Sequence, residues 1–219
     1  MPGGYRRTAD LPQVIPVFPL DGALLLPRSE LPLQIFEPRY LNMIDDAMAG
    51  DRLIGMVQTR PGGDRARPAL TQVGCVGRIT SYAETSDGRY LITLTGVCRY
   101  RISEELNART PYRQLRAEYG LYEDDLTVSA ASPLIDRQRF ARALKAYLNH
   151  RDLDVDWDTA NNAPIEALVN SLSMGLPFTP AEKQALLEAG DFNDRYKALT
   201  ALLEIDALED GDDDPHSVQ

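Results

Sequence analysis

The sequence predicts an α+β protein in which a bent β-barrel precedes a helical bundle. Up to residue 121, apolar residues alternate with polar ones or form short runs broken by proline and glycine, which is typical of β-strands. From residue 122, apolar side chains recur every three or four residues, which is typical of packed helices. The chain of 219 residues is long enough for two subdomains with separate cores. We expect a barrel subdomain over residues 12–121 and a helical subdomain over residues 122–208.

Prolines interrupt the strongly apolar stretch between residues 15 and 40. Proline cannot donate a hydrogen bond to a central strand, so these segments should be edge strands, bent strands or strands broken at bulges. Pro38 fits the first position of a helix that ends near Gly50. The expected strands are Ile15–Leu20, Ala23–Leu26 and Leu31–Phe36.

The clearest hairpin joins residues 71–83 to residues 89–102 through the turn signal Asp87-Gly88. A period of two predicts inward side chains at Tyr90, Ile92, Leu94, Cys98, Tyr100 and Ile102, and outward ones at Thr93, Thr95, Arg99 and Arg101. Gly96 interrupts the inward set and indicates a bulge or barrel corner. Strands over Arg52–Thr59 and Tyr112–Tyr119 should complete a barrel of about six strands.

Two cysteines lie on the two arms of this hairpin. A two-residue turn would place Cys75 opposite Tyr100 and Cys98 diagonally beside Cys75. Two small buried thiols or a disulfide would both fit, and the absence of C-x-x-C spacing favours thiols in a reducing cytoplasm.

About four helices are expected after the polar connection at residues 122–127. Their start and stop signals include Ser132-Pro133, Gly175, the capping box Thr179-Pro180-Ala181-Glu182, and Gly190. Residues 150–159 read as an acidic linker between the first two helices. The last helix should bury Tyr196, Leu199 and Leu203.

Several motifs resemble the N-terminal substrate-binding domain of Lon proteases, a domain also related to single-domain bacterial proteins and to cereblon. They are F-P-L at 18–20, L-P-L-Q-I-F-E-P-R-Y at 31–40, G-C-V-G-R-I at 74–79, D-G-R-Y-L-I-T-L-T-G-V-C-R-Y-R-I at 87–102, and E-K-Q-A-L-L-E at 182–188. The resemblance extends from Ile15 to Leu203, and the motifs follow one another in the same order as in that family. It implies a six-stranded PUA-like pseudo-barrel followed by a helical subdomain. Arg28 departs from the pattern, since the family usually has glycine there.

Catalytic motifs are absent from the sequence. It has neither a phosphate-binding loop nor a G-x-S-x-G elbow. Full Lon proteases carry an ATPase module and a Ser–Lys dyad after this domain, and the chain ends before both, so we expect no enzyme activity, no cofactor and no ATP dependence. His150 and His216 should be structural or solvated, and the run Asp212–Asp214 lacks the fixed geometry of a metal site.

The net charge of −10 is concentrated at the C-terminus, where seven acidic residues and no Lys or Arg follow from Glu204. We expect residues 209–219 to form a disordered acidic tail, solubilising or docking, and residues 1–11 a flexible arm. The acidic balance argues against nucleic acid. No apolar run is long enough for a membrane span and no secretory signal is visible, so a cytoplasmic protein is expected, and the family resemblance implies a bacterial one.

Three arginines are the predicted peptide-binding residues. Arg78, Arg99 and Arg101 should form an outward basic strip, which is either a solvated face or the rim of a peptide site. The segment 60–68 should be an exposed loop, whose three arginines could also meet an anionic partner. Glu37 and Arg39 should form an ion pair that braces the bend.

The function that follows is a non-catalytic polypeptide-binding module. Its ligand would be an unfolded segment, a degron or a partner protein, in cooperation with a separate protease or chaperone. The ligand could add to a proline-broken sheet edge or lie in a groove between barrel and bundle. The alternative is a PUA-like domain that binds RNA or a small ligand, and a hydrolase with an unrecognised site ranks last. The oligomeric state is not indicated.

Overall fold

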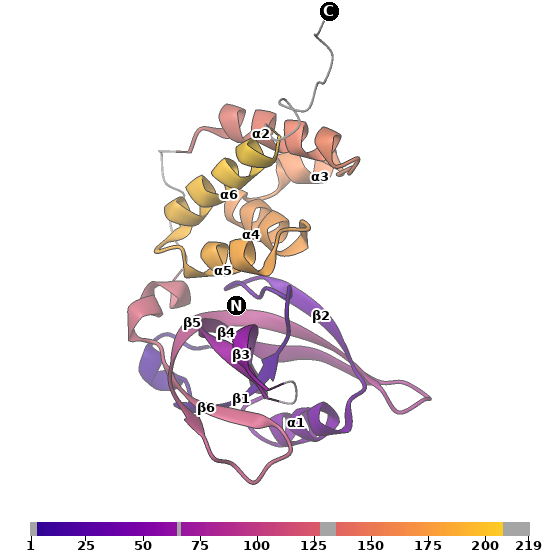
Figure 1. Ribbon diagram of the computed structural model, residues 1–219, viewed down its shortest axis with the longest axis vertical. Helices are drawn as coiled ribbons and strands as arrows, with labels where there is room; N and C mark the ends of the chain where they lie inside the picture. The colour runs from indigo at the N-terminus through magenta and orange to yellow at the C-terminus, as the bar shows by residue number, and fades with distance from the viewer. Residues whose placement is uncertain (1–3, 65–66, 128–134, 208–219) are drawn as a thin grey trace, which may run out of the picture. The chain divides into compact units, whose positions relative to one another are not determined.

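The computed structural model describes residues 4–64, 67–127 and 135–207 (Figure 1). It confirms the α+β class, with six strands in one mixed sheet accompanied by helices. The chain divides into two compact units. The barrel unit comprises Met1–Ser129 and Met174–Glu188, and the helical unit comprises Ala130–Ser173 and Ala189–Gln219.

Five strands of the barrel unit close on themselves, and a sixth extends the sheet at one edge (Figure 1). The sheet order is β2-β5-β4-β3-β1-β6, and β5 also pairs with β6. Only β1 and β3 are parallel among the described pairings. The strands are β1 (Val14–Pro19), β2 (Glu30–Ile35), β3 (Leu53–Gly63), β4 (Pro68–Glu84), β5 (Tyr90–Leu106) and β6 (Arg113–Glu118).

Strand β5 makes this closure possible because it is long and bends. Its first part, Tyr90–Thr95, pairs with β2, and its last part, Arg101–Leu106, pairs with β6. The predicted bulge at Gly96 is confirmed: Cys98 faces Val76 and Gly96 faces Gly77, so Val97 is the extra residue. A Cβ atom on Gly96 would lie 2.0 Å from the Leu26 carbonyl oxygen, so only glycine allows this close approach.

The barrel interior is built around Tyr100, which is fully buried and donates a hydrogen bond to the Met56 carbonyl at 3.2 Å. Apolar side chains from the five strands of the closed barrel form the same core cluster, including Ile15, Val57, Val76, Cys98 and Leu115. Two glycines lie beside the Tyr100 ring, where a side chain would not fit. A Cβ atom on Gly74 would lie 2.5 Å from Tyr100, and one on Gly55 would lie 2.7 Å from its hydroxyl.

The hairpin turn differs from the prediction by one residue. Thr85 and Arg89 close a loop of three residues, Ser86 to Gly88, in which Gly88 has φ 77°. Cys75 is therefore opposite Arg99, and Tyr100 is opposite Gly74. Both cysteines are buried free thiols, which confirms that expectation.

The segment Ala23–Leu26 is not a strand, although Leu24, Leu25 and Leu26 are buried. Their apolar character reflects packing under the sheet rather than strand pairing. The N-terminal segment is also more structured than a flexible arm, because Thr8–Asp10 forms the 3-10 turn η1 and Leu11 lies in the barrel core.

Besides η1, the barrel unit contains α1 (Pro38–Ala49), the 3-10 segment η2 (Gly120–Leu126) and α5 (Pro180–Glu188). The predicted capping box of α5 is present, since Thr179 and Glu182 exchange hydrogen bonds. The predicted boundary at residue 122 does not separate the two units, because α5 binds the barrel. Gln58 donates to the Pro180 carbonyl at 3.0 Å, and Lys183 donates to the Gly22 carbonyl at 2.8 Å.

The helical unit contains α2 (Arg137–His150), α3 (Trp157–Asn162), most of α4 (Ile165–Gly175) and α6 (Phe192–Asp206). Helices α2 and α6 pack together through Phe140 and Tyr196, whose ring centroids are 5.3 Å apart. The predicted linker 150–159 contains the start of α3. The predicted helix start at Ser132-Pro133 and the acidic tail 209–219 lie outside the described residues.

Candidate functional site

Arg99 does not face solvent, so its predicted outward orientation is wrong. Its side chain is 4% exposed and forms a bidentate ion pair with Asp125, with Nε and Oδ2 2.9 Å apart. It also donates to the Leu187 carbonyl at 3.0 Å and lies over the Tyr122 ring. The alternation in β5 predicted an outward side chain, but η2 and α5 cover that face of the strand. Arg99 therefore braces the fold and is not a rim contact.

The other two predicted arginines reach the surface at different places. Arg101 is exposed and pairs with Glu118 at 3.2 Å. Arg78 is half-buried in β4, opposite Leu53 and Thr95. The structure therefore does not bring the three predicted residues together as one strip.

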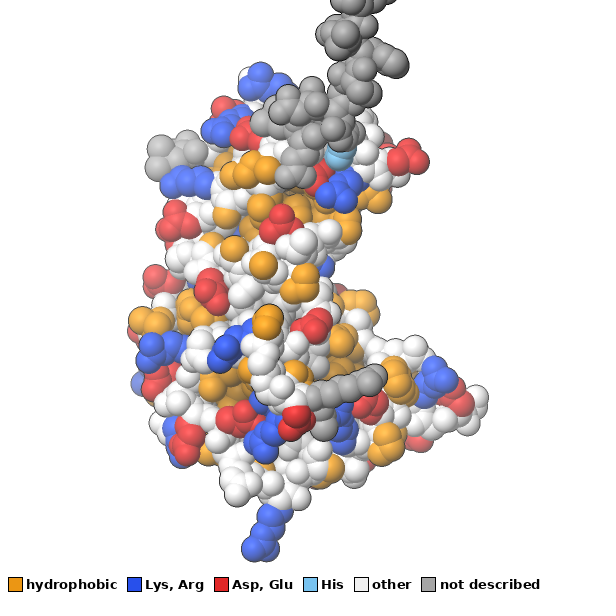
Figure 2. Space-filling model, viewed as in Figure 1, with side chains coloured by type: hydrophobic (Ala, Val, Ile, Leu, Met, Phe, Trp, Pro, Cys, Tyr) orange, Lys and Arg blue, Asp and Glu red, His pale blue; other side chains and the backbone are white. Residues whose placement is uncertain are grey.

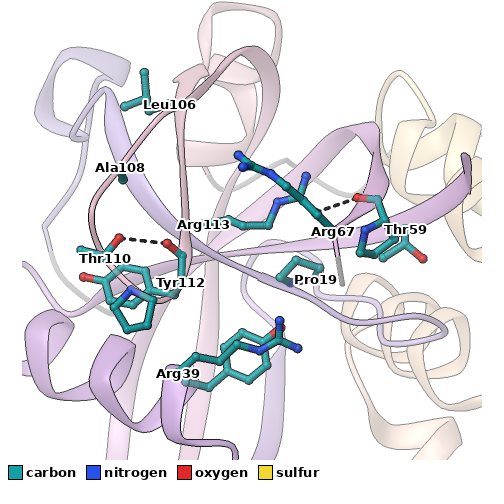
Figure 3. Close-up of a pocket in the computed structure, with 12 residues that line it drawn as sticks. Pro19, Arg39, Thr59, Arg67, Leu106, Ala108, Thr110, Tyr112 and Arg113 are labelled. Atoms are coloured by element: carbon teal, nitrogen blue, oxygen red, sulfur yellow. Dashed lines mark hydrogen bonds between the residues drawn. The ribbon is translucent and has the colours of Figure 1, made fainter. Parts of the chain in front are cut away.

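A pocket of about 290 Å³ lies at one end of the barrel (Figure 3). The sheet topology places the ends of β1, β3 and β5 beside the starts of β4 and β6. The first turn of α1 and the connection between β5 and β6 add to this end. The lining residues are Pro19, Arg39, Tyr40, Thr59, Arg67, Pro68, Leu106, Ala108, Thr110, Pro111, Tyr112 and Arg113.

Two arginines of the pocket share one carboxylate. Arg113 binds both carboxylate oxygens of Glu105, at 2.8 and 2.6 Å, and Arg67 binds Oε1 of the same group at 2.6 Å. Hydrogen bonds from Arg113, and then from Arg67, hold the pKa of Glu105 below its ordinary value although the group is partly buried. Arg113 also donates to the Pro68 carbonyl at 2.7 Å, which fixes its guanidinium.

Arg39 approaches from another side of the pocket (Figure 3). It pairs with Glu37 at 2.9 Å, which confirms the ion pair predicted for the bend. Its guanidinium lies 4.5 Å from the centroid of the Tyr40 ring, and Tyr40 in turn packs against Phe18 with centroids 4.3 Å apart. Tyr40 is 5% exposed, and burial raises the pKa of its hydroxyl, so this wall is a rigid neutral ring.

Three of the four pocket residues with hydroxyl groups, Thr59, Thr110 and Tyr112, already use them in hydrogen bonds. Tyr112 donates to Asp46 at 2.6 Å, and burial, followed by this bond, raises its pKa to about 12. Thr110 donates to the Tyr112 carbonyl at 2.9 Å, and Thr59 donates to Asp21 at 2.5 Å. Guanidinium groups and apolar walls therefore dominate what the pocket presents to a ligand.

A second feature is the outer edge of β2, which pairs with β5 alone among the described strands. Three large apolar side chains are exposed where β2 ends beside the β4–β5 hairpin: Phe36 (63%), Tyr82 (39%) and Leu91 (45%). Leu91 is directly opposite Gln34 of β2, and Phe36 follows the Ile35–Tyr90 pair. Figure 2 shows apolar side chains among charged ones on the projecting hairpin.

Sequence reasoning missed most of both features. The sequence pattern places Phe36 and Leu91 in strands and predicts no exposure for either side chain. Arg67 belongs to the segment 60–68, which the sequence predicts as an exposed loop able to meet an anionic partner, but strands β3 and β4 extend into this segment. Arg113 and Glu105 carry no local signal, because the fold alone brings them to Arg67.

Metal and membrane features are not seen in the described parts of the chain. No group of three His, Cys, Asp or Glu side chains there is arranged to hold a metal ion. His150 lies in the last turn of α2, with Nε2 3.8 Å from Asp206, whereas His216 and Asp212–Asp214 lie outside the described residues. No helix within the described ranges is both long and apolar enough to cross a membrane.

Curated relatives share sequence with most of this chain. The Lon protease of Syntrophus aciditrophicus is 28% identical over 214 residues, which cover 88% of this chain and 25% of that protein. Lon protease 2 of Myxococcus xanthus is 27% identical, and the match covers 92% of this chain and 25% of the relative. The chain thus spans about a quarter of the length of these relatives.

Solved structures support the same fold. A Lon N-terminal domain protein from Xanthomonas campestris has a TM-score of 0.59 at 20% identity, and the match covers 86% of this chain and 97% of that one. The N-terminal domain of a Mycobacterium avium complex Lon protease has a TM-score of 0.58 at 17% identity, covering 88% and 98%.

The family model of the ATP-dependent protease La (LON) substrate-binding domain matches residues 14–204, which include every described strand and all but the last two residues of α6. The resemblance inferred from the sequence motifs is confirmed, and the chain belongs to the LON substrate-binding domain family.

Proposed function

We propose that this chain is a non-catalytic module that binds extended polypeptide segments in the bacterial cytoplasm without using ATP. The family model that matches residues 14–204 is described as a substrate-binding domain. The observation that carries the proposal is the open edge of β2 beside the exposed side chains of Phe36, Tyr82 and Leu91. The barrel would then act as a PUA-like platform for a peptide.

An extended ligand can add to this edge as a further strand. Its backbone would exchange hydrogen bonds with β2, each contributing about 0.5–1.5 kcal/mol. Pro32 lacks an N–H group, so it limits the length of the added strand and favours short segments. The ligand's alternate side chains would cover Leu91 and Phe36, which supplies the apolar part of the affinity.

Arg78 and Arg101 remain candidates for contacts at the rim, because both reach the surface of the barrel unit. They lie at separate places, so each would contact a different part of a long ligand. Arg99 is excluded from this role by its burial.

The test is fluorescence anisotropy with a labelled unfolded protein, a labelled native protein and a labelled RNA. We expect saturable binding to the unfolded chain alone. The Leu91→Lys variant should weaken it about tenfold or more, since burying one such side chain contributes about 1.5–3 kcal/mol. The control is Leu153→Lys, which changes a similarly exposed leucine (40%) of the helical unit.

Equal weakening by both leucine variants would contradict binding at the β2 edge. Saturable binding of the RNA, with no binding of the unfolded chain, would contradict the proposed function and support the RNA-binding alternative.

A further inference from the structure

We propose that the barrel-end pocket binds a carboxylate group of the polypeptide, either its C-terminal carboxylate or an acidic side chain next to an apolar residue. This inference rests on the proposed polypeptide binding. It adds a second binding site on the barrel unit, besides the β2 edge, and gives that site a preference for carboxylates.

The first argument is charge. Arg39, Arg67 and Arg113 line the pocket, and Glu37 and Glu105 are the carboxylates that pair with them. Two guanidinium groups share Glu105, and no carboxylate is among the described residues that line the pocket, because Asp21, Asp46 and Asp64 bond to Thr59, Tyr112 and the Arg67 backbone from behind it. A lining with three arginines and no carboxylate stands out in a chain whose net charge is −10. An anion entering the pocket would complete the second pair.

The second argument is the supply of hydrogen-bond donors. A guanidinium has five N–H groups, and Arg67 uses its Nε and Nη2 groups on a single oxygen of Glu105, at 3.0 and 2.6 Å. Its side chain is 56% exposed, so its remaining N–H groups can reach a ligand. The fork geometry of a guanidinium fits a planar carboxylate especially well.

The third argument is the shape and polarity of the walls. Pro19, Pro68 and Pro111 present rigid apolar rings, and Leu106 and Ala108 add aliphatic surface. The volume of about 290 Å³ suits one or two side chains. A carboxylate attached to an apolar group would use both the guanidinium groups and these walls.

Glu105 occupies the position that the ligand carboxylate would share. It binds Arg113 through both oxygens and leaves Arg67 with the weaker, one-oxygen contact. A ligand would therefore recruit Arg67 and leave the Arg113–Glu105 pair intact. Removing the charge of Glu105 should free guanidinium donors and strengthen ligand binding, which is the opposite of what removing Arg67 should do.

The experiment is an NMR titration of the full chain, following the backbone amide signals of Tyr112 and Arg113. The probes are N-acetyl-leucine, its amide, and the dipeptide N-acetyl-Asp-Leu-amide, which separate a terminal carboxylate from an acidic side chain. We expect saturable shifts with at least one of the two carboxylate probes and none with the leucine amide. The probe that binds identifies the source of the carboxylate.

Variants then test the residues. Arg67→Gln should weaken binding about fivefold, because one charge-assisted contact is lost at a partly exposed site. Glu105→Gln should tighten it about threefold, since a competing negative charge is removed while a hydrogen-bond acceptor stays. The control is Arg139→Gln in the helical unit, where Arg139 is 58% exposed and pairs with Glu204 at 2.7 Å; binding should not change.

Equal shifts with the acid and the amide, or equal effects of Arg67→Gln and Arg139→Gln, would overturn the carboxylate site. If unfolded protein still binds in the anisotropy assay, only this inference fails. If neither the probes nor the unfolded protein bind, the proposed polypeptide binding fails as well.

Discussion

Tyr100 fits inside the barrel because two neighbouring residues have no side chain. Gly74 is directly opposite Tyr100, and a Cβ atom there would lie 2.4 Å from the Met56 carbonyl oxygen and 2.5 Å from the tyrosine ring. The Met56 carbonyl and the Tyr100 ring both lie in the closely packed interior, so neither can shift without a cost in free energy. The glycine at the start of the G-C-V-G-R-I motif therefore serves packing.

Replacing Gly74 with alanine should destabilise the protein by about 1–3 kcal/mol, the usual cost of overpacking a core. Urea unfolding followed by circular dichroism measures the loss. Gly120→Ala is the matched control, since a Cβ atom there meets nothing within 4 Å, and its effect should stay within about 0.5 kcal/mol. A Gly74→Ala protein as stable as the control would contradict the packing argument.

Arg28 shows how a single residue can keep a backbone shape that glycine would adopt more easily. Its φ is 64°, in the left-handed region, where a residue with a Cβ atom is strained. Its guanidinium donates to the carbonyls of Asp125 and Thr127, at 2.5 and 3.3 Å. These bonds offset the strain and tie the bend before β2 to η2.

At the scale of elements, the buried Arg99–Asp125 pair joins β5 to η2. Asp125 accepts from the Arg99 backbone and from two nitrogens of its side chain, each at 2.9 Å. Asp125→Ala should cost about 3–5 kcal/mol, because it leaves a buried guanidinium without its carboxylate. The double change Arg99→Met with Asp125→Ala should cost less than Asp125→Ala alone, since it also removes that unpaired charge.

Thermal unfolding of both variants measures this difference. The exposed pair Arg101–Glu118 supplies the control, since Glu118→Gln should change stability by no more than about 1 kcal/mol. A double variant less stable than Asp125→Ala alone would show that Arg99 stabilises the fold mainly through its other contacts.

The same elements show what local sequence patterns can predict. Alternation located the strands because each buries one face in the barrel, and turn residues located their ends. The pattern failed between Thr95 and Arg99, where both faces of β5 are buried. The covering elements, η2 and α5, come from later in the chain, so no signal near Arg99 could reveal them. The pocket was missed for a similar reason, since Arg39, Arg67 and Arg113 meet only through the closure of the barrel.

At the scale of the whole molecule, the chain leaves the barrel unit and later returns to it through Met174–Glu188. Helix α5 in this returning segment makes several hydrogen bonds to the sheet. Gln58 donates to Gln184 at 3.0 Å, Gln184 donates to the Val73 carbonyl at 3.1 Å, and Arg99 donates to the Leu187 carbonyl. A barrel cut at the end of η2 would lose all of these partners.

A fragment of residues 1–129 should therefore be less stable than the whole chain by at least about 3 kcal/mol. Several hydrogen bonds worth about 0.5–1.5 kcal/mol each are lost, and Gln58, which is 2% exposed, would lose the α5 groups that it binds. Thermal unfolding by circular dichroism gives the comparison, and a chain ending at residue 207 is the control because it keeps every described residue. A synthetic peptide of residues 174–190 should raise the melting temperature of the fragment, because the peptide binds the folded state of the barrel and not the unfolded state. If the fragment has the same melting temperature as the whole chain, and the peptide does not raise it, α5 adds nothing to the stability of the barrel.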